Sequence, residues 1–146
     1  RRTVYTGPLD AYFGHDEGHL PYRSMAFAEE TRPAFGVQPC GTINFPDDRP
    51  QTRTTEQGWL TGEAQGMSVL VTEYPQAHVP GVNEPFYPVP GDAGEALARR
   101  YRARAEALSG RVWFAGRLAD YQYYNMDQAA ARAMALVAKE ILPLAG

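Results

Sequence analysis

The stretch that decides the fold is VWFAGRLADYQYYNMDQ, residues 112–128. It opens with four apolar residues, Val112 to Ala115, which predict a short buried strand. Asn125 and Gln128 stand three positions apart in the pattern of a capping box. Apolar residues then recur at helical spacing, at Met126, Ala130, Met134, Val137 and Ile141. The stretch therefore predicts a strand, a loop and a closing helix.

A second helix is predicted directly before this strand. Asp92 and Glu95 form another capping box, and Ser109-Gly110 ends the segment. The apolar residues between them recur at nearly helical spacing, at Ala93, Leu97, Tyr101, Ala105 and Leu108.

The first half of the chain carries strand patterns instead. A β-favouring run covers residues 1–5, and its abrupt start suggests an interior strand of a larger protein. Turn-forming residues separate four more candidates, whose spacing favours an antiparallel sheet: Tyr22–Ala28, Thr42–Phe45, Thr52–Gln57 and Met67–Tyr74. The proline-rich stretch Pro75–Pro90 is expected to be an extended connection. We predict an α+β chain with an antiparallel sheet followed by helix, strand and helix.

Composition excludes several classes of protein. The chain has 146 residues, 44% hydrophobic and 21% charged, as in ordinary globular domains. No apolar run is long enough to cross a bilayer, so we expect no membrane segment and a cytoplasmic protein. The net charge of -3 gives no basic field for nucleic acid. All basic residues except Lys139 are arginines, a bias that suits bidentate phosphate recognition or simply reflects genomic base composition.

No metal site is predicted. The single Cys40 is expected to be structural, and it has no second cysteine with which to form a Cys-x-x-Cys pair. His15 and His19 flank an acidic loop; a metal site there is the alternative, but we expect them to be solvated loop residues.

Residues 116–128 are the strongest candidates for chemistry. An arginine follows the strand, three tyrosines come next, and a helix then starts with unpaired backbone N–H groups that favour negative charge. Such a helix start suits an anionic cofactor edge. The alternative is that the tyrosines pack the core and Asn125 only caps the helix.

This segment resembles the C-terminal signature of the UDP-galactopyranose mutases, which is Gly-Arg-Leu, a short spacer and Tyr-Tyr-Asp-Met-Asp-Gln. Further stretches resemble the same family in the same order: VYTGPLD at 4–10, Tyr12-Phe13, LPYRS at 20–24, Asn44 ahead of Thr52-Arg53, Glu73-Tyr74-Pro75 and EPFYPV at 84–89. The resemblance covers nearly the whole chain.

The resemblance implies a flavoprotein isomerase. The chain would complete a Rossmann-like FAD-binding protein, with residues 1–20 ending the flavin domain, 21–90 forming the substrate domain and 91–146 returning to the flavin domain. Its reaction would interconvert UDP-galactopyranose and UDP-galactofuranose through an adduct at N5 of reduced FAD. The glycine fingerprint for FAD is absent from the chain, so we expect an N-terminal FAD-binding segment elsewhere and no activity from these 146 residues alone. A homodimer is compatible with this assignment.

The resemblance also implies roles for individual residues on the substrate side. Arg53 matches the arginine that contacts the substrate diphosphate and is the expected catalytic residue. Tyr87 and Tyr123 match tyrosines that hydrogen-bond the diphosphate. Asn44 aligns with a substrate-side asparagine, although the loop that follows is one residue shorter than usual. Asn125 stands where the family has aspartate; it still caps a helix but carries no charge.

On the cofactor side, the resemblance implies flavin contacts from Arg117 and Tyr124, from the helix start Met126, Asp127 and Gln128, and from Arg23. Two other functions remain open. One is a flavin amine-oxidase-like oxidoreductase, and the other is a non-catalytic nucleotide-sugar-binding relative in which Asn125 marks lost chemistry.

Overall fold

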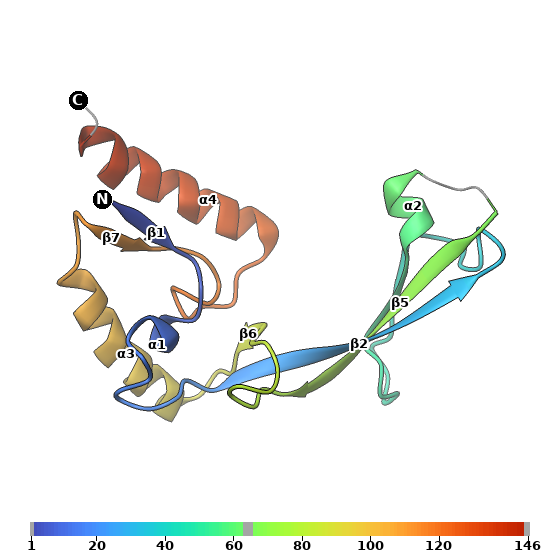
Figure 1. Cartoon of the computed structure of the whole chain (residues 1–146), viewed down its shortest axis with the longest axis horizontal. Helices are drawn as coiled ribbons and strands as arrows, with labels where there is room; N and C mark the ends of the chain where they lie inside the picture. The colour runs from blue at the N-terminus through green and yellow to red at the C-terminus, as the bar shows by residue number, and fades with distance from the viewer. Residues whose placement is uncertain (1, 63–65, 145–146) are drawn as a thin grey trace. The chain divides into compact units, whose positions relative to one another are not determined.

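The computed structural model describes residues 2–62 and 66–144 and has the predicted α+β character, with an antiparallel sheet and helices (Figure 1). It divides into two compact units. Unit 1 comprises Arg1–Arg23 and Pro85–Gly146, and unit 2 comprises Ser24–Glu84. No helix among the described residues combines the length and the apolar character that crossing a bilayer needs.

Unit 1 is layered about a pair of parallel strands, β1 (Thr3–Tyr5) and β7 (Val112–Phe114). Successive residues of a strand point to opposite sides, so neighbouring residues of β7 contact different helices. Buried Trp113 packs with Leu136 of helix α4 (Met126–Leu136), whereas Phe114 packs with Tyr101 of helix α3 (Asp92–Glu106). Helices therefore cover both faces of the strand pair, α4 on one side and α3 with the short α1 (Leu9–Tyr12) on the other (Figure 1).

The larger core of unit 1 lies between α1, α3 and the loops beside them. Its buried members are Leu9, Leu20, Tyr22, Ala98, Tyr101 and Tyr121. Helix α3 approaches this core closely at Gly94, where a Cβ atom would lie 2.8 Å from the Tyr121 hydroxyl and 2.9 Å from Cγ of Pro21. Glycine is required there because any side chain would collide with both neighbours.

Unit 2 is an antiparallel sheet in the order β3 (Thr42–Asn44), β4 (Arg53–Glu56), β5 (Ser68–Ala77), β2 (Tyr22–Arg32). Strand β2 begins in unit 1, where its first two residues pair with β6 (Tyr87–Pro88). The buried Glu56 carboxylate at the end of β4 accepts three backbone N–H groups, from Gly36 at 2.9 Å, Val37 at 3.2 Å and Gln38 at 2.8 Å. This carboxylate holds the loop before β3 against the sheet.

The predicted strands and helices are present, with differences at their ends. Strand β2 continues beyond Ala28 to Arg32, and β5 continues beyond Tyr74 to Ala77, inside the stretch expected to be a connection. Sequence analysis missed α1 and α2 (Gln57–Thr61), which are too short to show a hydrophobic period. After α4 the chain continues as a π-helical turn, Val137–Ile141, and a 3-10 turn, Leu142–Leu144. Arg1, where the first β-favouring run starts, lies outside the described residues.

Candidate functional site

Four of the predicted site residues come together in unit 1. The Arg117 guanidinium lies 4.7 Å from the ring centre of Tyr87 and 5.2 Å from that of Tyr123. The two rings stack on each other with centroids 5.7 Å apart. Arg117 also donates two hydrogen bonds to the backbone carbonyl of Tyr124, one of them from Nε at 3.1 Å. A cation is thus held in a defined position beside two tyrosine rings.

The loop after β7 carries Arg117, Tyr123 and Tyr124 of this cluster, and two residues that the sequence analysis did not single out hold the loop in place. The Asp120 carboxylate accepts the Gly116 N–H at 3.1 Å and pairs with Arg132 of α4 at 3.2 Å. Tyr121 has a positive φ of 49° and is buried, and its hydroxyl donates to the carbonyls of Pro21 and Val89. No local pattern could have indicated the role of Tyr121, because its partners Pro21 and Val89 are distant in the sequence; Asp120 is close to Gly116 in the sequence, but no motif marked it.

Beside the cluster, α4 begins with an accessible first turn. The Asn125 N–H donates to the Gln128 side chain at 2.9 Å, which is one half of the predicted capping box. Met126 is 90% exposed and Tyr123 is 65% exposed, and Asp127 is exposed as well. The predicted flavin-side residues at this helix start are therefore available to a ligand, and the partial positive charge of the helix end favours an anionic one.

Arg117 also lines an apolar groove of about 390 Å³. The groove runs between β1, the loop after β7 and one face of α4, and its walls include Val4, Leu118, Ala129 and Ala133. A flat apolar group with a negative edge would match such a surface, because the walls are apolar and, among the described residues of the lining, the charged one is the Arg117 cation.

Burial raises the pKa of two tyrosine hydroxyls next to the cluster, those of Tyr121 and Tyr124. It raises the pKa of Tyr124, and the nearby Asp120 carboxylate adds to this effect. Burial, helped by the charge of Glu95, raises the pKa of Tyr121 to about 12. Both hydroxyls therefore stay protonated and remain hydrogen-bond donors at neutral pH.

The other predicted residues occupy strands. In unit 2, Asn44 and Arg53 are directly opposite each other in the β3–β4 register. The Arg53 side chain is 45% exposed, and its Nε lies 3.7 Å from a carboxylate oxygen of Glu73 on β5. In unit 1, Arg23 is exposed and pairs in register with Tyr87. The Arg53 guanidinium is therefore accessible, and the Glu73 carboxylate, 3.7 Å away, compensates its positive charge only weakly.

The fold and the cluster define a class: an α+β protein with arginine and tyrosine side chains set beside a helix N-terminus, an arrangement suited to anionic ligands. Comparison with known proteins narrows this class. A family model described as UDP-galactopyranose mutase matches residues 1–123. The chain belongs to the UDP-galactopyranose mutase family.

Individual relatives agree with the family match. UDP-galactopyranose mutase of Mycoplasma genitalium is 34% identical over 131 residues, covering 86% of this chain and 32% of the relative. A probable UDP-galactopyranose mutase of Klebsiella pneumoniae is 35% identical over 133 residues, covering 89% and 34%. The dTDP-fucopyranose mutase of Escherichia coli is 30% identical over 125 residues, covering 84% and 33%. The chain spans about a third of the length of these relatives.

Proposed function

We propose that this chain is part of a flavin-dependent mutase that interconverts UDP-galactopyranose and UDP-galactofuranose. Family membership supports the reaction class. The observation that carries the proposal is the gathering of Arg117, Tyr87 and Tyr123 beside the start of α4, because the motif resemblance implies flavin and diphosphate contacts at these positions.

The described residues fit one edge of a flavin. Arg117 supplies a fixed cation, α4 supplies an exposed N-terminal turn and the adjoining groove is apolar. We assign Arg117, Tyr124, Arg23 and the first turn of α4, Met126, Asp127 and Gln128, to the flavin side. Reduced FAD would supply the nucleophilic chemistry of the ring contraction. The layers of unit 1 would then belong to a Rossmann-like FAD-binding domain, formed by residues 1–20 and 91–146, with residues 21–90 as the substrate domain.

The substrate diphosphate requires donors that stay charged or protonated. We assign it to the Arg53 guanidinium and to the hydroxyls of Tyr87 and Tyr123. A guanidinium holds two phosphate oxygens at once, and tyrosine hydroxyls add directional hydrogen bonds as UDP departs. Asn44 and Asn125 are assigned to the sugar side. The charge that aspartate carries in the family is absent at Asn125, so this residue acts by hydrogen bonding alone.

The test is conversion of UDP-galactofuranose by the full-length protein that carries this chain, purified with FAD and reduced with dithionite. We expect formation of UDP-galactopyranose over many turnovers, with no electron acceptor consumed. Acceptor consumption at every turnover would support the amine-oxidase-like function instead. UDP binding with conversion at background would support a non-catalytic relative, and either result would overturn the proposal.

A second candidate is suggested by the similarity to a dTDP-fucopyranose mutase. The same ring contraction could act on a different nucleotide and a 6-deoxy sugar. Running dTDP-fucose beside UDP-galactose in the same assay separates the two, since the preferred substrate has the higher kcat/KM.

A further inference from the structure

Three side chains of unit 1 that take no part in the proposed reaction lie together, one of them buried, one half-buried and one exposed. They are Asp10, His15 and His19, and one ligand atom from each lies within 4.8 Å of the other two. Asp10 Oδ2 and His15 Nδ1 are 3.0 Å apart, and the rings of His15 and His19 are 4.3 Å apart. Sequence analysis expected solvated histidines here. His15 is instead half-buried against a buried carboxylate.

The carboxylate of Asp10 is fixed by groups other than the histidines. Its Oδ2 atom accepts the Leu20 N–H at 2.9 Å, and its Oδ1 atom accepts the Tyr22 hydroxyl at 3.4 Å. The Asp10 side chain is 2% exposed, so it has little freedom to turn away. Hydrogen bonds of this kind orient carboxylate ligands in metal sites.

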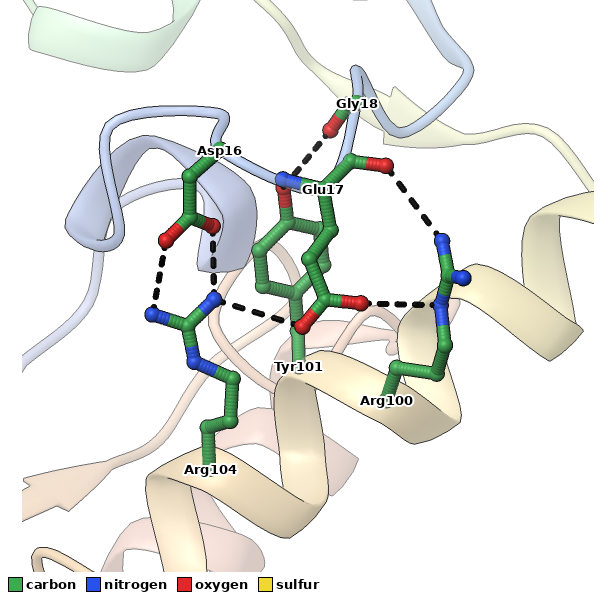
Figure 2. A network of polar contacts seen from close by, with 6 residues as sticks. All are labelled: Asp16, Glu17, Gly18, Arg100, Tyr101 and Arg104. Carbon is green, nitrogen blue, oxygen red and sulfur yellow. Dashed lines mark hydrogen bonds and ion pairs between the residues drawn. The ribbon is translucent and has the colours of Figure 1, made fainter.

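The loop between the two histidines is fixed as well, by three residues of α3 (Figure 2). The Tyr101 hydroxyl accepts the Glu17 N–H at 3.0 Å and donates to the Gly18 carbonyl at 2.8 Å. Arg104 holds the Asp16 carboxylate through two hydrogen bonds of 2.6 and 2.8 Å, and Arg100 pairs with Glu17 at 2.9 Å.

These contacts hold the backbone of His15 at a positive φ of 58°, a conformation that few residues with a Cβ adopt. The His15 ring is hydrogen-bonded to Asp10 and lies against the His19 ring, so the three donors are close together before any ion binds, which lowers the ordering that binding must impose.

We propose that Asp10, His15 and His19 bind one divalent transition-metal ion, with Zn²⁺ the expected occupant. Two imidazoles and one carboxylate are the donor set that zinc accepts, and water would complete the coordination. With bonds of about 2.0–2.1 Å, two ligands of one tetrahedral ion lie about 3.3 Å apart. Asp10 and His15 are already near that separation at 3.0 Å. The exposed His19 side chain supplies the remaining movement by rotation.

The test is calorimetric titration of the full-length protein with ZnCl₂, after metal removal with a chelator. We expect one saturable site per chain with a dissociation constant in the micromolar range, and a higher unfolding temperature in excess Zn²⁺. His19→Ala should weaken binding at least tenfold and remove the rise in unfolding temperature. This side chain is exposed, so the variant is expected to fold.

Two control variants distinguish this site from nonspecific binding of zinc elsewhere on the protein. His78→Ala removes a histidine of unit 2 that bonds to Asn83, and Cys40→Ser removes an exposed thiol. Both variants should bind Zn²⁺ as the parent protein does. The proposal is overturned if the parent shows no saturable binding up to millimolar Zn²⁺, if His19→Ala binds with unchanged affinity, or if either control variant loses the site.

Discussion

Replacing Tyr101 by phenylalanine removes a single oxygen atom that joins helix α3 to the loop of residues 13–20. The side chain is fully buried, and its ring stacks on Phe13 with centroids 5.7 Å apart. Because phenylalanine keeps the ring, packing in the core should be preserved. The loss is confined to two hydrogen bonds, one with the Glu17 N–H and one with the Gly18 carbonyl.

The expected cost follows from these two bonds. A neutral hydrogen bond contributes about 0.5–1.5 kcal/mol net, so Tyr101→Phe should reduce the free energy of unfolding of unit 1 by about 2 kcal/mol. The loop backbone at Glu17 is only half-buried, and water reaching its freed groups keeps the cost well below that of burying them unpaired. A change of 2 kcal/mol corresponds to about 30-fold in an equilibrium constant.

Native-state hydrogen exchange measures this directly, because the Glu17 amide is one of the two affected groups. Exchange at Glu17 should quicken by about 30-fold in Tyr101→Phe, and urea denaturation should show the matching loss. Tyr123→Phe is the matched control: its side chain is 65% exposed, so stability should change by less than about 0.5 kcal/mol. Unchanged Glu17 exchange in Tyr101→Phe would refute the reasoning.

Three further predictions concern stability. Gly94→Ala normally favours a helix, yet here it should destabilise by about 1–3 kcal/mol in urea denaturation, because the new Cβ would lie 2.8 Å from the Tyr121 hydroxyl; a more stable variant would contradict this packing. Glu56→Gln should lower the urea midpoint, since an amide offers one acceptor oxygen where the carboxylate accepts three N–H groups; an unchanged midpoint would show that the loop does not depend on this contact. A hydrogen bond from Arg104 lowers the pKa of Asp16 below its usual value of about 3.9, so the stabilisation is complete above that pH and is lost as the pH falls through the lowered value. Asp16→Asn should therefore lose less stability than the parent between about pH 5 and about pH 2, and equal losses would contradict the assignment.

Local patterns in the sequence predicted most of the secondary structure. The capping pattern of Asn125 and Gln128 correctly placed the start of α4, whose N-cap is Asn125. The pattern of Asp92 and Glu95 found the start of α3 only to within one residue, because the N-cap is Gly91, no side chain caps it, and Glu95 pairs with Arg102 instead. The strand patterns were found because alternating and β-branched residues are local signals. The apolar period along the last helix did not indicate which of its residues are buried. Met126 and Met134 are 90% and 73% exposed, and Leu136, outside that period, makes the buried contact with β7. Periodicity alone does not say which apolar stripe is covered.

The candidate site was predictable only in part. Motif resemblance selected Arg117, Tyr87 and Tyr123, and the structure brings these three side chains together. Nothing local in the sequence connects Arg117 with Tyr87, thirty positions earlier, because their contact depends on the pairing of β2 with β6 and on the loop after β7. Asp10 is only five positions before His15, yet the sequence did not show that its carboxylate is buried beside the histidine. Its burial arises from the core around α1.

The most direct test of the proposed function is kcat/KM for UDP-galactofuranose in the full-length protein with Arg53→Ala. A charge-assisted contact to a diphosphate is worth about 1.5–3 kcal/mol, so kcat/KM should fall roughly 10- to 100-fold or more. Arg49→Ala is the control, because this exposed arginine pairs with Asp47 in a turn of the same unit; it should retain the parental value. A parental kcat/KM in Arg53→Ala, or an equal loss in both variants, would contradict the account.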